Sequence, residues 1–522
     1  MRVVTAEEMR RLDRLTIDTH GVPSLRLMER AGQSVVDVIL ERWSDLARRG
    51  VLVVAGKGNN GGDGLVIARL LREREFPCEV ACIARAEDLS ADAAANLERY
   101  RAVKGVFTEV PPNDLDPLRG RMKDKGLLVD ALLGTGLRSP VEGFLADVVE
   151  LMNASGLPII AVDTPSGLDS DRGTPLGATI QAEATVTFGF PKAGQVIHPG
   201  VVYSGDLVVA DIGIHPKAVA EVDGSLELLD AADVVWCLPR RADDSHKGSY
   251  GHLLVMAGSR GKTGAAVLGC RAAMRVGTGL VTLAAPRALN GILAGALVES
   301  MTEQVGGPGE EQWPALVAAD WEALAERKSA VLFGPGVGVH ASAQTTLETL
   351  LEYCRVPWLI DADGLNNLAT DVSRLREARV APVLTPHPGE MSRLTGLDTA
   401  AVNGDRIGIA RAFAAEHRCF LVLKGARTVT ATPEGQVSIN PTGNSGMASG
   451  GMGDVLAGIV AGFLAQGLAP EDAVRLGVYL HGRTGDRVAD DRGAVGLIAS
   501  DLVDELPRTI QELTQVRELI RV

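Results

Sequence analysis

Short apolar runs alternate with longer helical patterns along the whole of this chain. In the first half the apolar runs lie at 51–55, 78–84, 127–132, 159–162 and 186–188, and helical patterns such as 65–74 and 143–152 separate them. Runs that are apolar at every position are typical of strands with both faces buried, as in a parallel sheet covered by helices. The alternation therefore predicts an α/β fold.

The same alternation restarts in the second half of the chain. Its apolar runs lie at 252–257, 280–284, 330–333, 358–360, 383–385 and 420–423, and strong helical patterns follow Asp454. Between Pro216 and Leu238, charged residues, Gly224 and prolines interrupt the pattern. We expect two three-layer αβα domains, residues 1–224 and residues 225–522.

Composition narrows the possible classes of function. The 522 residues are 46% hydrophobic and 23% charged, as in ordinary globular domains. The excess of 66 acidic over 52 basic residues gives a net charge of −14, which argues against binding to nucleic acid or to anionic membranes. The cysteines are scattered, no signal-peptide pattern is found and no apolar run approaches the ~20 residues of a membrane span, so we expect a cytoplasmic protein with reduced thiols.

The most specific motif is the glycine-rich run from Gly443 to Asp454, which leads into an apolar helical pattern. A glycine turn before a helix presents free backbone N–H groups and the positive end of the helix dipole, a combination that binds phosphate. A carboxylate beside an anion site is electrostatically unfavourable, so Asp454 needs a role of its own. The pattern leaves two roles open, a helix N-cap and a catalytic base.

The first half has its own glycine loop, G-K-G-N-N-G-G-D-G, from Gly56 to Gly64. Its spacing matches neither a Walker A loop nor the dinucleotide fingerprint G-x-G-x-x-G, so on its own it indicates only a nucleotide-like ligand. The amides of Asn59 and Asn60 and the carboxylate of Asp63 suit ribose hydroxyls or a weakly held cation. Asn-Gly and Gly-Asp also form ordinary turns, which leaves a structural role open.

Two further segments place an aspartate at the end of an apolar run. Asp130 is followed by a glycine turn that reaches Pro140, and Asp163 is followed by a Thr-Pro-Ser-Gly turn. In an open parallel sheet, ligands bind at the carboxyl ends of the strands. Asp163 is therefore a candidate acid or base, with a structural turn as the alternative.

Through these three segments, roughly residues 1–220 resemble the Rossmann-like epimerase domain of bifunctional NAD(P)H-hydrate repair enzymes. The resemblance implies that this domain interconverts the R and S epimers of hydrated NADH and NADPH. It also implies that Asp163 sits at the reacting ring and that Asn60, Asp130 and Ser166 hold K⁺. The implied contacts to the hydrated dinucleotide are Asn59, Asn60, Gly61, Gly62, Asp63, Gly134, Thr135, Gly136, Leu137, Arg138, Ser139, Pro140 and Asp163.

Polar segments of the second half also follow apolar runs and are expected to face one crevice. They begin at Gly334, Asp361, Thr385 and Lys424. His387 lies between two prolines, which favours ligand contact over packing in a core. Asp361 and Asp363 have the spacing that places side chains on opposite faces of a strand, so only one of them is expected to meet a ligand.

Roughly residues 230–522 resemble the NAD(P)H-hydrate dehydratase branch of the ribokinase-like fold, mainly through the run that ends at Asp454. The resemblance implies that ADP donates a phosphoryl group and leaves AMP and phosphate, although the residues alone leave ADP and ATP open. It implies that Gly338, His387 and Asp454 contact the S hydrate. The implied nucleotide contacts are Lys424, Gly425, Ala426, Arg427, Thr428, Asn444, Ser445, Gly446, Met447, Ala448, Ser449, Gly450, Gly451, Met452 and Gly453. We expect Mg²⁺ to bridge the nucleotide phosphates, through ligands that the spacing does not identify.

Together these features predict an enzyme that repairs hydrated NADH and NADPH. Phosphorylation would turn the ring hydroxyl into a good leaving group, with Asp454 as the base and glycine amides stabilising the transferring phosphoryl group. The alternative is a true small-molecule kinase of a vitamin precursor in the second half, joined to a noncatalytic ligand-binding module in the first. We also expect the chain to form a homo-oligomer.

Overall fold

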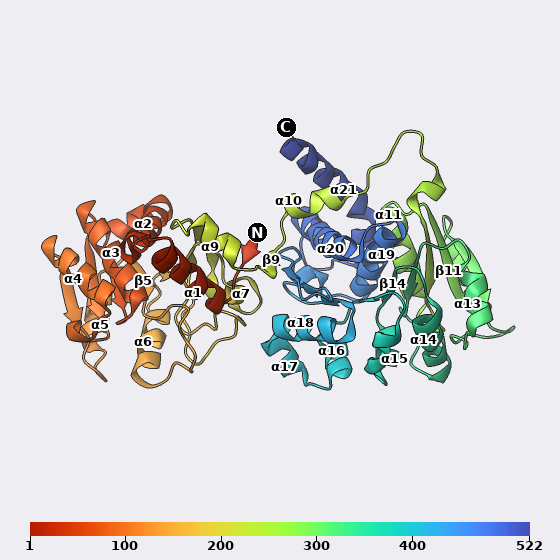
Figure 1. The fold of residues 1–522 in the computed structure, drawn as a ribbon, viewed down its shortest axis with the longest axis horizontal. Helices are drawn as coiled ribbons and strands as arrows, with labels where there is room; N and C mark the ends of the chain where they lie inside the picture. Colours follow the sequence, from red (N-terminus) through yellow and green to blue (C-terminus); the bar gives the residue numbers. More distant parts are fainter. Residues whose placement is uncertain (522) are drawn as a thin grey trace. The chain divides into compact units, whose positions relative to one another are not determined.

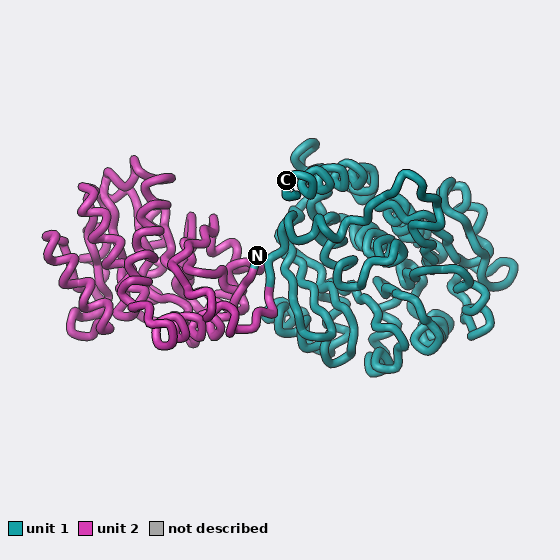
Figure 2. Tube along the Cα trace, turned by 45° about the horizontal axis from the view of Figure 1, so that its top comes forward, with its two compact units in different colours: residues 1, 227–522 teal, residues 2–226 magenta. Residues whose placement is uncertain are grey.

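The computed structural model describes residues 1–521, which form two compact units (Figure 2). The N-terminal unit consists of residues 2–226, and the C-terminal unit consists of Met1 and the residues from Glu227 onward. Each unit contains a largely parallel sheet with helices packed on it (Figure 1). The predicted α/β fold is therefore confirmed for both halves of the chain.

The sheet of the N-terminal unit has the strand order β4-β3-β2-β5-β6-β7-β8, and all of these strands are parallel. The strands are β2 (Val51–Ala55), β3 (Cys78–Cys82), β4 (Val106–Glu109), β5 (Leu127–Ala131), β6 (Ile159–Val162), β7 (Ala184–Phe188) and β8 (Asp206–Ala210). The chain adds β3 and β4 on one side of β2 and then returns to add β5 on the other. The segments after β2 and β5 diverge at this reversal, which is where open sheets form a ligand crevice.

Helices cover both faces of this sheet. They are α1 (Ala6–Arg14), α2 (Ser24–Arg48), α3 (Asn59–Glu73), α4 (Ala91–Ala102), α5 (Asp116–Met122), α6 (Gly143–Asn153), α7 (Ala193–Val196), α8 (Gly200–Ser204) and α9 (Pro216–Glu221), with the short helical segments η1 (Leu15–Thr19) and η2 (Ala86–Asp88). The short strands β1 (Arg2–Val3) and β9 (Leu226–Leu228) are not part of this sheet. Val51 and Val53 pack with residues of α2 and α3, whereas Leu52 and Val54 pack with residues of α5 and α6. Neighbouring residues of β2 thus pack into hydrophobic cores on opposite faces of the sheet, as expected for a strand covered by helices on both sides.

The first glycine loop differs from its sequence prediction. α3 begins at Asn59, with Gly58 as its N-cap, so most of the loop forms the first turns of the helix. A Cβ at Gly64 would lie 2.6 Å from the Cβ of Ala131 and 2.9 Å from Cγ1 of Val53. The glycines therefore allow the start of α3 to pack directly against the sheet, which a helix with side chains at these positions could not do.

The sheet of the C-terminal unit contains strands in the order β18-β17-β16-β15-β14-β13-β10-β11-β12. The strands are β10 (His252–Met256), β11 (Leu280–Pro286), β12 (Met301–Val305), β13 (Ala330–Phe333), β14 (Trp358–Ile360), β15 (Val383–Leu384), β16 (Phe420–Leu423), β17 (Val429–Ala431) and β18 (Val437–Ile439). From β12 to β16 the strands are parallel, and β17 and β18 add an antiparallel extension that the sequence analysis missed. In this sheet the order of strand addition reverses between β10 and β13, because β11 and β12 lie on one side of β10 and β13 lies on the other.

The helices of this unit are α10 (Ala231–Val234), α11 (Thr263–Arg275), α12 (Asn290–Ala296), α13 (Ala318–Ala325), α14 (Ala341–Tyr353), α15 (Asp363–Leu368), α16 (Pro388–Thr395), α17 (Thr399–Gly404), α18 (Arg406–His417), α19 (Met452–Ala465), α20 (Pro470–Arg492) and α21 (Ala499–Arg521). Short turns are η3 (Val235–Cys237), η4 (Lys247–Tyr250), η5 (Arg287–Leu289), η6 (Val372–Glu377) and η7 (Ser445–Met447). α19, which follows the glycine-rich run, is buried along almost its whole length in the main core.

Glycines bring α19 close to its neighbour α11. A Cβ at Gly458 would lie 2.3 Å from the main-chain oxygen of Gly269 in α11. A helix that is apolar on all sides belongs in a protein core or in a membrane, and the packing here identifies a core helix. Within residues 1–521, no helix is both long enough and apolar enough to cross a membrane.

Candidate active sites

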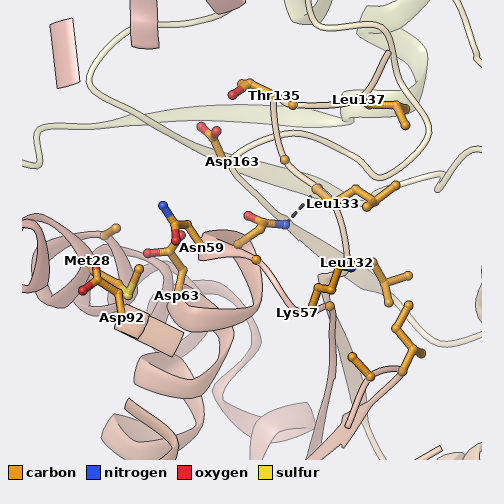
Figure 3. A pocket seen from close by; sticks show the side chains of 18 of the residues that line it. Met28, Lys57, Asn59, Asp63, Asp92, Leu132, Leu133, Thr135, Leu137 and Asp163 are labelled. Atoms are coloured by element: carbon orange, nitrogen blue, oxygen red, sulfur yellow. Dashed lines mark hydrogen bonds between the residues drawn. The ribbon is translucent and has the colours of Figure 1, made fainter. Parts of the chain in front are cut away.

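A cavity of about 1400 Å³ lies at the carboxyl end of the N-terminal sheet (Figure 3). Its walls come from α1, α2, the start of α3, and the segments that follow β2, β3, β5, β6 and β7. Pockets for small ligands commonly measure ~300–1,000 Å³. This cavity therefore has room for a ligand as large as a dinucleotide.

Most of the contacts predicted for the first half line this cavity. They are Asn59, Asn60, Asp63, Gly134, Thr135, Gly136, Leu137, Arg138, Ser139 and Asp163. Gly61, Gly62 and Pro140 are not among the lining residues. A Cβ at Gly61 would lie 2.0 Å from the oxygen of Gly56, and one at Gly62 would lie 2.9 Å from Sδ of Met28, so these two glycines allow close packing behind the wall.

Asp163 follows β6 and has a φ of 63°, a left-handed conformation that is uncommon for aspartate. Two hydrogen bonds hold it there: its N–H donates to the oxygen of Val186 (2.9 Å), and Nε2 of Gln195 donates to its own main-chain oxygen (2.5 Å). Figure 3 shows Asp163 among the side chains that line the cavity. Backbone strain of this kind clusters at functional sites.

The structure adds Lys192, which the sequence analysis passed over. Its side chain is 1% exposed, it lines the cavity, and its Nζ donates to Oδ1 of Asp163 at 2.5 Å. Lys192 lies in the segment after β7. The strand-end argument that identified Asp130 and Asp163 would have identified it too, had that segment been followed past its glycine and proline.

Two more carboxyl groups lie close to this ion pair. Burial raises the pKa of Asp13 to about 6, with Lys192 opposing the rise and Asp163 adding to it. Burial also raises the pKa of Asp63 well above its usual value, and Asp163 and Asp13 add to that rise. The cavity can therefore hold a protonated acid and a carboxylate at once, as proton transfer in both directions requires. Asp13 comes from α1, which gave no motif in the sequence.

The residues expected to hold K⁺ form one hydrogen-bonded group. Ser166 donates to Asp130 through Oγ (2.7 Å) and through its N–H (2.8 Å), and Asn60 Nδ2 donates to the main-chain oxygen of Leu133 (2.9 Å). Asp130 is fully buried, which raises its pKa to about 6. Within residues 1–521 its hydrogen-bond donors, Ser166 and Leu132, are neutral. A cation would balance this buried charge, and the oxygens present suit a hard cation.

In the C-terminal unit, the ends of β14 and β16 and the start of α16 bring charged groups together. Nζ of Lys424 donates to Oδ1 of Asp361 at 2.8 Å and lies 3.7 Å from Oε2 of Glu390. The side chains are 18%, 2% and 7% exposed, respectively. Buried charges remain stable only when they are paired in this way.

Asp454 lies in the first turn of α19, close to this cluster. The N-cap of the helix is Gly451, with a φ of 89°, so the N-cap role that the sequence left open for Asp454 is wrong. Burial raises the pKa of Asp454 to about 6; Asp361 adds to the rise and Lys424 opposes it. The N–H groups at the start of a helix have no partner inside the helix, so an acid with a raised pKa here lies next to an anion-binding helix end.

The expectation that only one of Asp361 and Asp363 meets the site is wrong in its premise. β14 ends at Ile360, Ala362 has a φ of 52°, and α15 begins at Asp363, so the strand alternation does not apply. Both carboxylates raise the pKa of Asp454. Oδ2 of Asp363 also accepts a hydrogen bond from the N–H of Gly338 (2.9 Å), which links that predicted contact to the site.

His387 combines a structural role with an exposed edge. It is the N-cap of α16, and its Nδ1 accepts hydrogen bonds from the N–H groups of Gly389 (3.0 Å) and Glu390 (3.3 Å). Its side chain is 50% exposed, and Nε2 lies 3.5 Å from Oε1 of Glu390. Although capping uses Nδ1 and Nε2 lies near Glu390, half of the ring surface is exposed and can contact a ligand.

A carboxylate outside the glycine-rich run fixes the start of that run. Asp486 in α20 accepts hydrogen bonds from the N–H of Gly443 and from Nδ2 of Asn444, each 3.0 Å long. Oδ1 of Asn444 in turn accepts from the N–H of Gly446 (3.0 Å), at the turn η7. Nothing in the local sequence pattern pointed to Asp486.

A buried arginine shapes the other segment expected to bind nucleotide. Arg406 donates to the main-chain oxygens of Leu423 (3.0 Å) and Ala426 (2.6 Å). The glycine turn approaches the same segment, since a Cβ at Gly453 would lie 3.3 Å from Nζ of Lys424. The segments 424–428 and 444–453 therefore meet at Lys424.

Comparison with known proteins accounts for this pair of sites. The family described as NAD(P)H-hydrate dehydratase matches residues 253–508, and the family described as YjeF-related protein N-terminus matches residues 24–194. The bifunctional NAD(P)H-hydrate repair enzyme of Moorella thermoacetica is 44% identical over 100% of this chain and 98% of its own length. The chain belongs to this family of bifunctional repair enzymes. The Escherichia coli member is 35% identical over 97% of this chain and 93% of its own.

Among solved structures, an ADP/ATP-dependent NAD(P)H-hydrate dehydratase from Bacillus subtilis is 32% identical, with 55% of this chain and 98% of that chain covered and a TM-score of 0.48. The family assignment confirms the resemblance drawn from the sequence motifs. The full-length relatives are named as bifunctional repair enzymes. They do not support the alternative of a vitamin-precursor kinase joined to a noncatalytic module.

Proposed function

We propose that the N-terminal domain, residues 1–224, interconverts the R and S epimers of hydrated NADH and NADPH, and that residues 225–522 dehydrate the S hydrate. ADP would donate the phosphoryl group and leave as AMP. The observation that carries the proposal is Asp454, an acid whose pKa is raised to about 6 at a glycine-rich helix start. Family membership supports the pairing of the two activities.

In the dehydration step, Asp454 takes the proton of the ring hydroxyl while the hydroxyl oxygen attacks the terminal phosphoryl group of ADP. The amides of Gly450, Gly451 and Gly453 stabilise the charge on that group, at ~2.7–4 kcal/mol for a single well-placed donor. The C–O bond then breaks with help from the ring nitrogen lone pair, phosphate leaves, and the adjacent ring carbon loses a proton. The products are NAD(P)H, AMP and phosphate.

The nucleotide contacts in this proposal are the segments 424–428 and 444–453, and Gly338 and His387 contact the hydrate. The convergence of both segments on Lys424 supports the assignment. Asp361, Asp363, Glu390 and Asp454 outnumber the lysines beside them, so a dication brought with the nucleotide phosphates suits the local charge. Mg²⁺ in that position would neutralise charge on the transferring phosphoryl group.

In the epimerisation step, Asp13 or Asp63 protonates the ring hydroxyl, and its C–O bond breaks with help from the ring nitrogen lone pair so that water leaves. Asp163 then takes a proton from the water that adds to the other face of the same carbon. The shared position of these aspartates at the cavity wall supports these roles. The segments 59–63 and 134–140, most of which line the cavity, would contact the dinucleotide. Asn60, Asp130 and Ser166 would hold K⁺, whose charge would fix the turn at Leu133 against the cavity.

One experiment tests both activities. Purified protein is incubated with mixed epimers of NADH hydrate, Mg²⁺, K⁺ and either ADP or ATP, while NADH absorbance is followed. Full conversion with one nucleotide, together with its dephosphorylated product and phosphate, is the expected result. Conversion that stalls when one epimer is spent would contradict the epimerase, and a stable phosphoester without NADH would contradict the dehydratase.

A further inference from the structure

The N-terminal cavity contains one buried lysine whose role neither the motifs nor the proposed proton transfers explain. Lys192 has 0% of its surface exposed, although lysine is among the residues least often buried. Its N–H donates to Oε1 of Gln195 (2.8 Å), and Nε2 of the same Gln195 donates to the main-chain oxygen of Asp163 (2.5 Å). Gln195 is itself fully buried. The side chain of Gln195 thus holds the backbones of both Lys192 and Asp163 in place.

The ammonium group of Lys192 has all of its donors in use. Nζ donates to Oδ1 of Asp163 (2.5 Å), Oγ1 of Thr187 (2.9 Å) and the main-chain oxygen of Phe188 (3.1 Å). An ammonium group has three donors. Lys192 is therefore held as a charged donor rather than as a free amine that could act as a base or nucleophile.

The carboxylate of Asp163 is held asymmetrically. Oδ1 accepts hydrogen bonds from Lys192, from Oγ1 of Thr187 (3.2 Å) and from the N–H of Phe188 (3.3 Å). Within residues 1–521 these are the hydrogen bonds to this carboxylate, so Oδ2 remains for a ligand. The side chain is 15% exposed and lines the cavity (Figure 3).

We propose that Lys192 is a positioning residue of the epimerase reaction, because its ammonium group fixes Asp163 with one oxygen bound and the other turned to the substrate. This inference rests on the epimerase activity and on the base role of Asp163 proposed above. A simple structural ion pair would need one carboxylate, whereas Asp13 and Asp63 line the same cavity as Lys192 and Asp163. The surplus of acids around one lysine fits proton exchange rather than a scaffold.

The test compares Lys192→Met with Lys125→Met. Lys125 is 11% exposed, pairs with Glu79 at 2.6 Å in the same unit, and does not line the cavity, so its variant controls for the loss of a largely buried ion pair. Epimerisation is measured with hydrate enriched in the R epimer. The dehydratase rate on the S epimer in the same preparation reports the amount of active C-terminal unit, and thermal unfolding compares the folding of the variants with that of the wild type.

Lys192→Met is expected to lower kcat for epimerisation about 100-fold, with KM changed less than about threefold. The acid limb of the pH–rate profile of Lys192→Met should move to higher pH, because a carboxylate that loses a neighbouring positive charge holds its proton more tightly. Lys192→Ala should regain part of the rate when ethylamine is added, whereas Lys125→Met should match wild type in both rate and pH profile.

Equal kcat and unchanged pH profiles in the two methionine variants would overturn the positioning role and leave the epimerase intact. If wild-type protein dehydrates the S hydrate but does not convert the R hydrate, the proposed epimerase function itself is overturned. If Lys192→Met fails to fold, the ethylamine response of Lys192→Ala decides: recovery supports the inference, and a flat response contradicts it.

Discussion

Both units bury a lysine against an aspartate at the carboxyl end of a parallel sheet, but the proposed base occupies a different place in each. In the N-terminal unit, Lys192 binds Asp163, which is itself the proposed base. In the C-terminal unit, Lys424 binds Asp361, and the proposed base Asp454 stands beside that pair. A buried lysine–aspartate pair therefore does not by itself identify the catalytic carboxylate.

The difference matches the two reactions. In the proposed dehydration, Asp454 would accept a proton from a hydroxyl near neutral pH, and a base is most effective when its pKa lies close to the working pH. Burial and the neighbouring Asp361 raise its pKa to about 6, which a direct lysine contact would prevent. In the proposed reaction, Lys424 would instead remain available to the nucleotide phosphates. Epimerisation involves no phosphate transfer, so Lys192 can be committed to Asp163.

The largest expected effect is the loss of the C-terminal base. Asp454→Ala should lower kcat for dehydration by about 10⁴-fold while nucleotide affinity, measured by calorimetry, changes less than about threefold. Asp504→Ala is a matched control, because Asp504 is 72% exposed on α21 in the same unit. Equal loss of nucleotide binding and dehydration in Asp454→Ala would point to a structural role instead.

Asp163→Asn tests the N-terminal base in the same way. Epimerisation should fall about 10³-fold, because an amide cannot take up the proton, while dehydration of the S hydrate continues at the wild-type rate. The measurement is the rate of NADH formation from R hydrate and from S hydrate in parallel. Retained epimerisation would reject Asp163 as the base and move attention to Asp13 and Asp63.

Lys424→Met addresses the comparison directly. Because Lys424 opposes the rise in the pKa of Asp454, its removal should push that pKa further above 6 and should weaken phosphate binding. We expect dehydration to fall about 100-fold, with both kcat and KM affected, unlike the kcat-specific loss expected for Lys192→Met. A KM left unchanged in Lys424→Met would show that the two lysines act alike.

The wild-type pH profile should separate the two sites. Asp454 must be ionised to act as a base, so the dehydration rate should be flat above its pKa of about 6 and fall about tenfold for each pH unit below it. Initial rates from pH 5 to pH 8 at saturating ADP measure this limb. A rate independent of pH across that range would be incompatible with Asp454 as the base.

The last prediction concerns stability rather than rate, at the proposed cation site. The pKa of Asp130 is raised by burial to about 6, above its ordinary value of 3.8, so its ionised form destabilises the fold fully above pH 6 and not at all below about pH 3.8. At pH 7.5 without K⁺, Asp130→Asn should raise the unfolding free energy by up to about 3 kcal/mol. Adding K⁺ should stabilise wild type but not the variant, as thermal unfolding would show. K⁺ stabilisation of both proteins would contradict this site.

The local sequence patterns predicted the strands and helices better than they predicted the residues of the two sites. The strands predicted in the first half end within two residues of their predicted limits, because a run apolar at every position is readily buried as a central strand. The strands β4, β8, β12, β17 and β18 were missed, as were the two- and three-residue strands β1 and β9. β4, β8 and β12 are partly exposed and are not apolar at every position, and β17 and β18 form a hairpin whose short runs give little periodicity.

Within the sites, the residues that sit in glycine or proline motifs were found, and those held by distant partners were not. Lys192, Asp13, Asp486 and Arg406 lie in unremarkable sequence and matter because of groups far along the chain. The first glycine loop was placed in a turn because glycine signals turns, whereas packing against β2 and β5 makes it helical.

The sequence by itself determined the α/β class, the two-domain layout and the family, because strand burial, helix starts and glycine turns are encoded within short windows. Only the tertiary structure decided which carboxylate pairs with which lysine. Protonation depends on burial and on charges from other elements: the pKa of Asp454 reflects Asp361, Lys424, Asp363 and Glu390, which come from separate strand ends and helices. No short stretch of sequence contains that information, because these charged residues come together only when the sheet and its helices have formed.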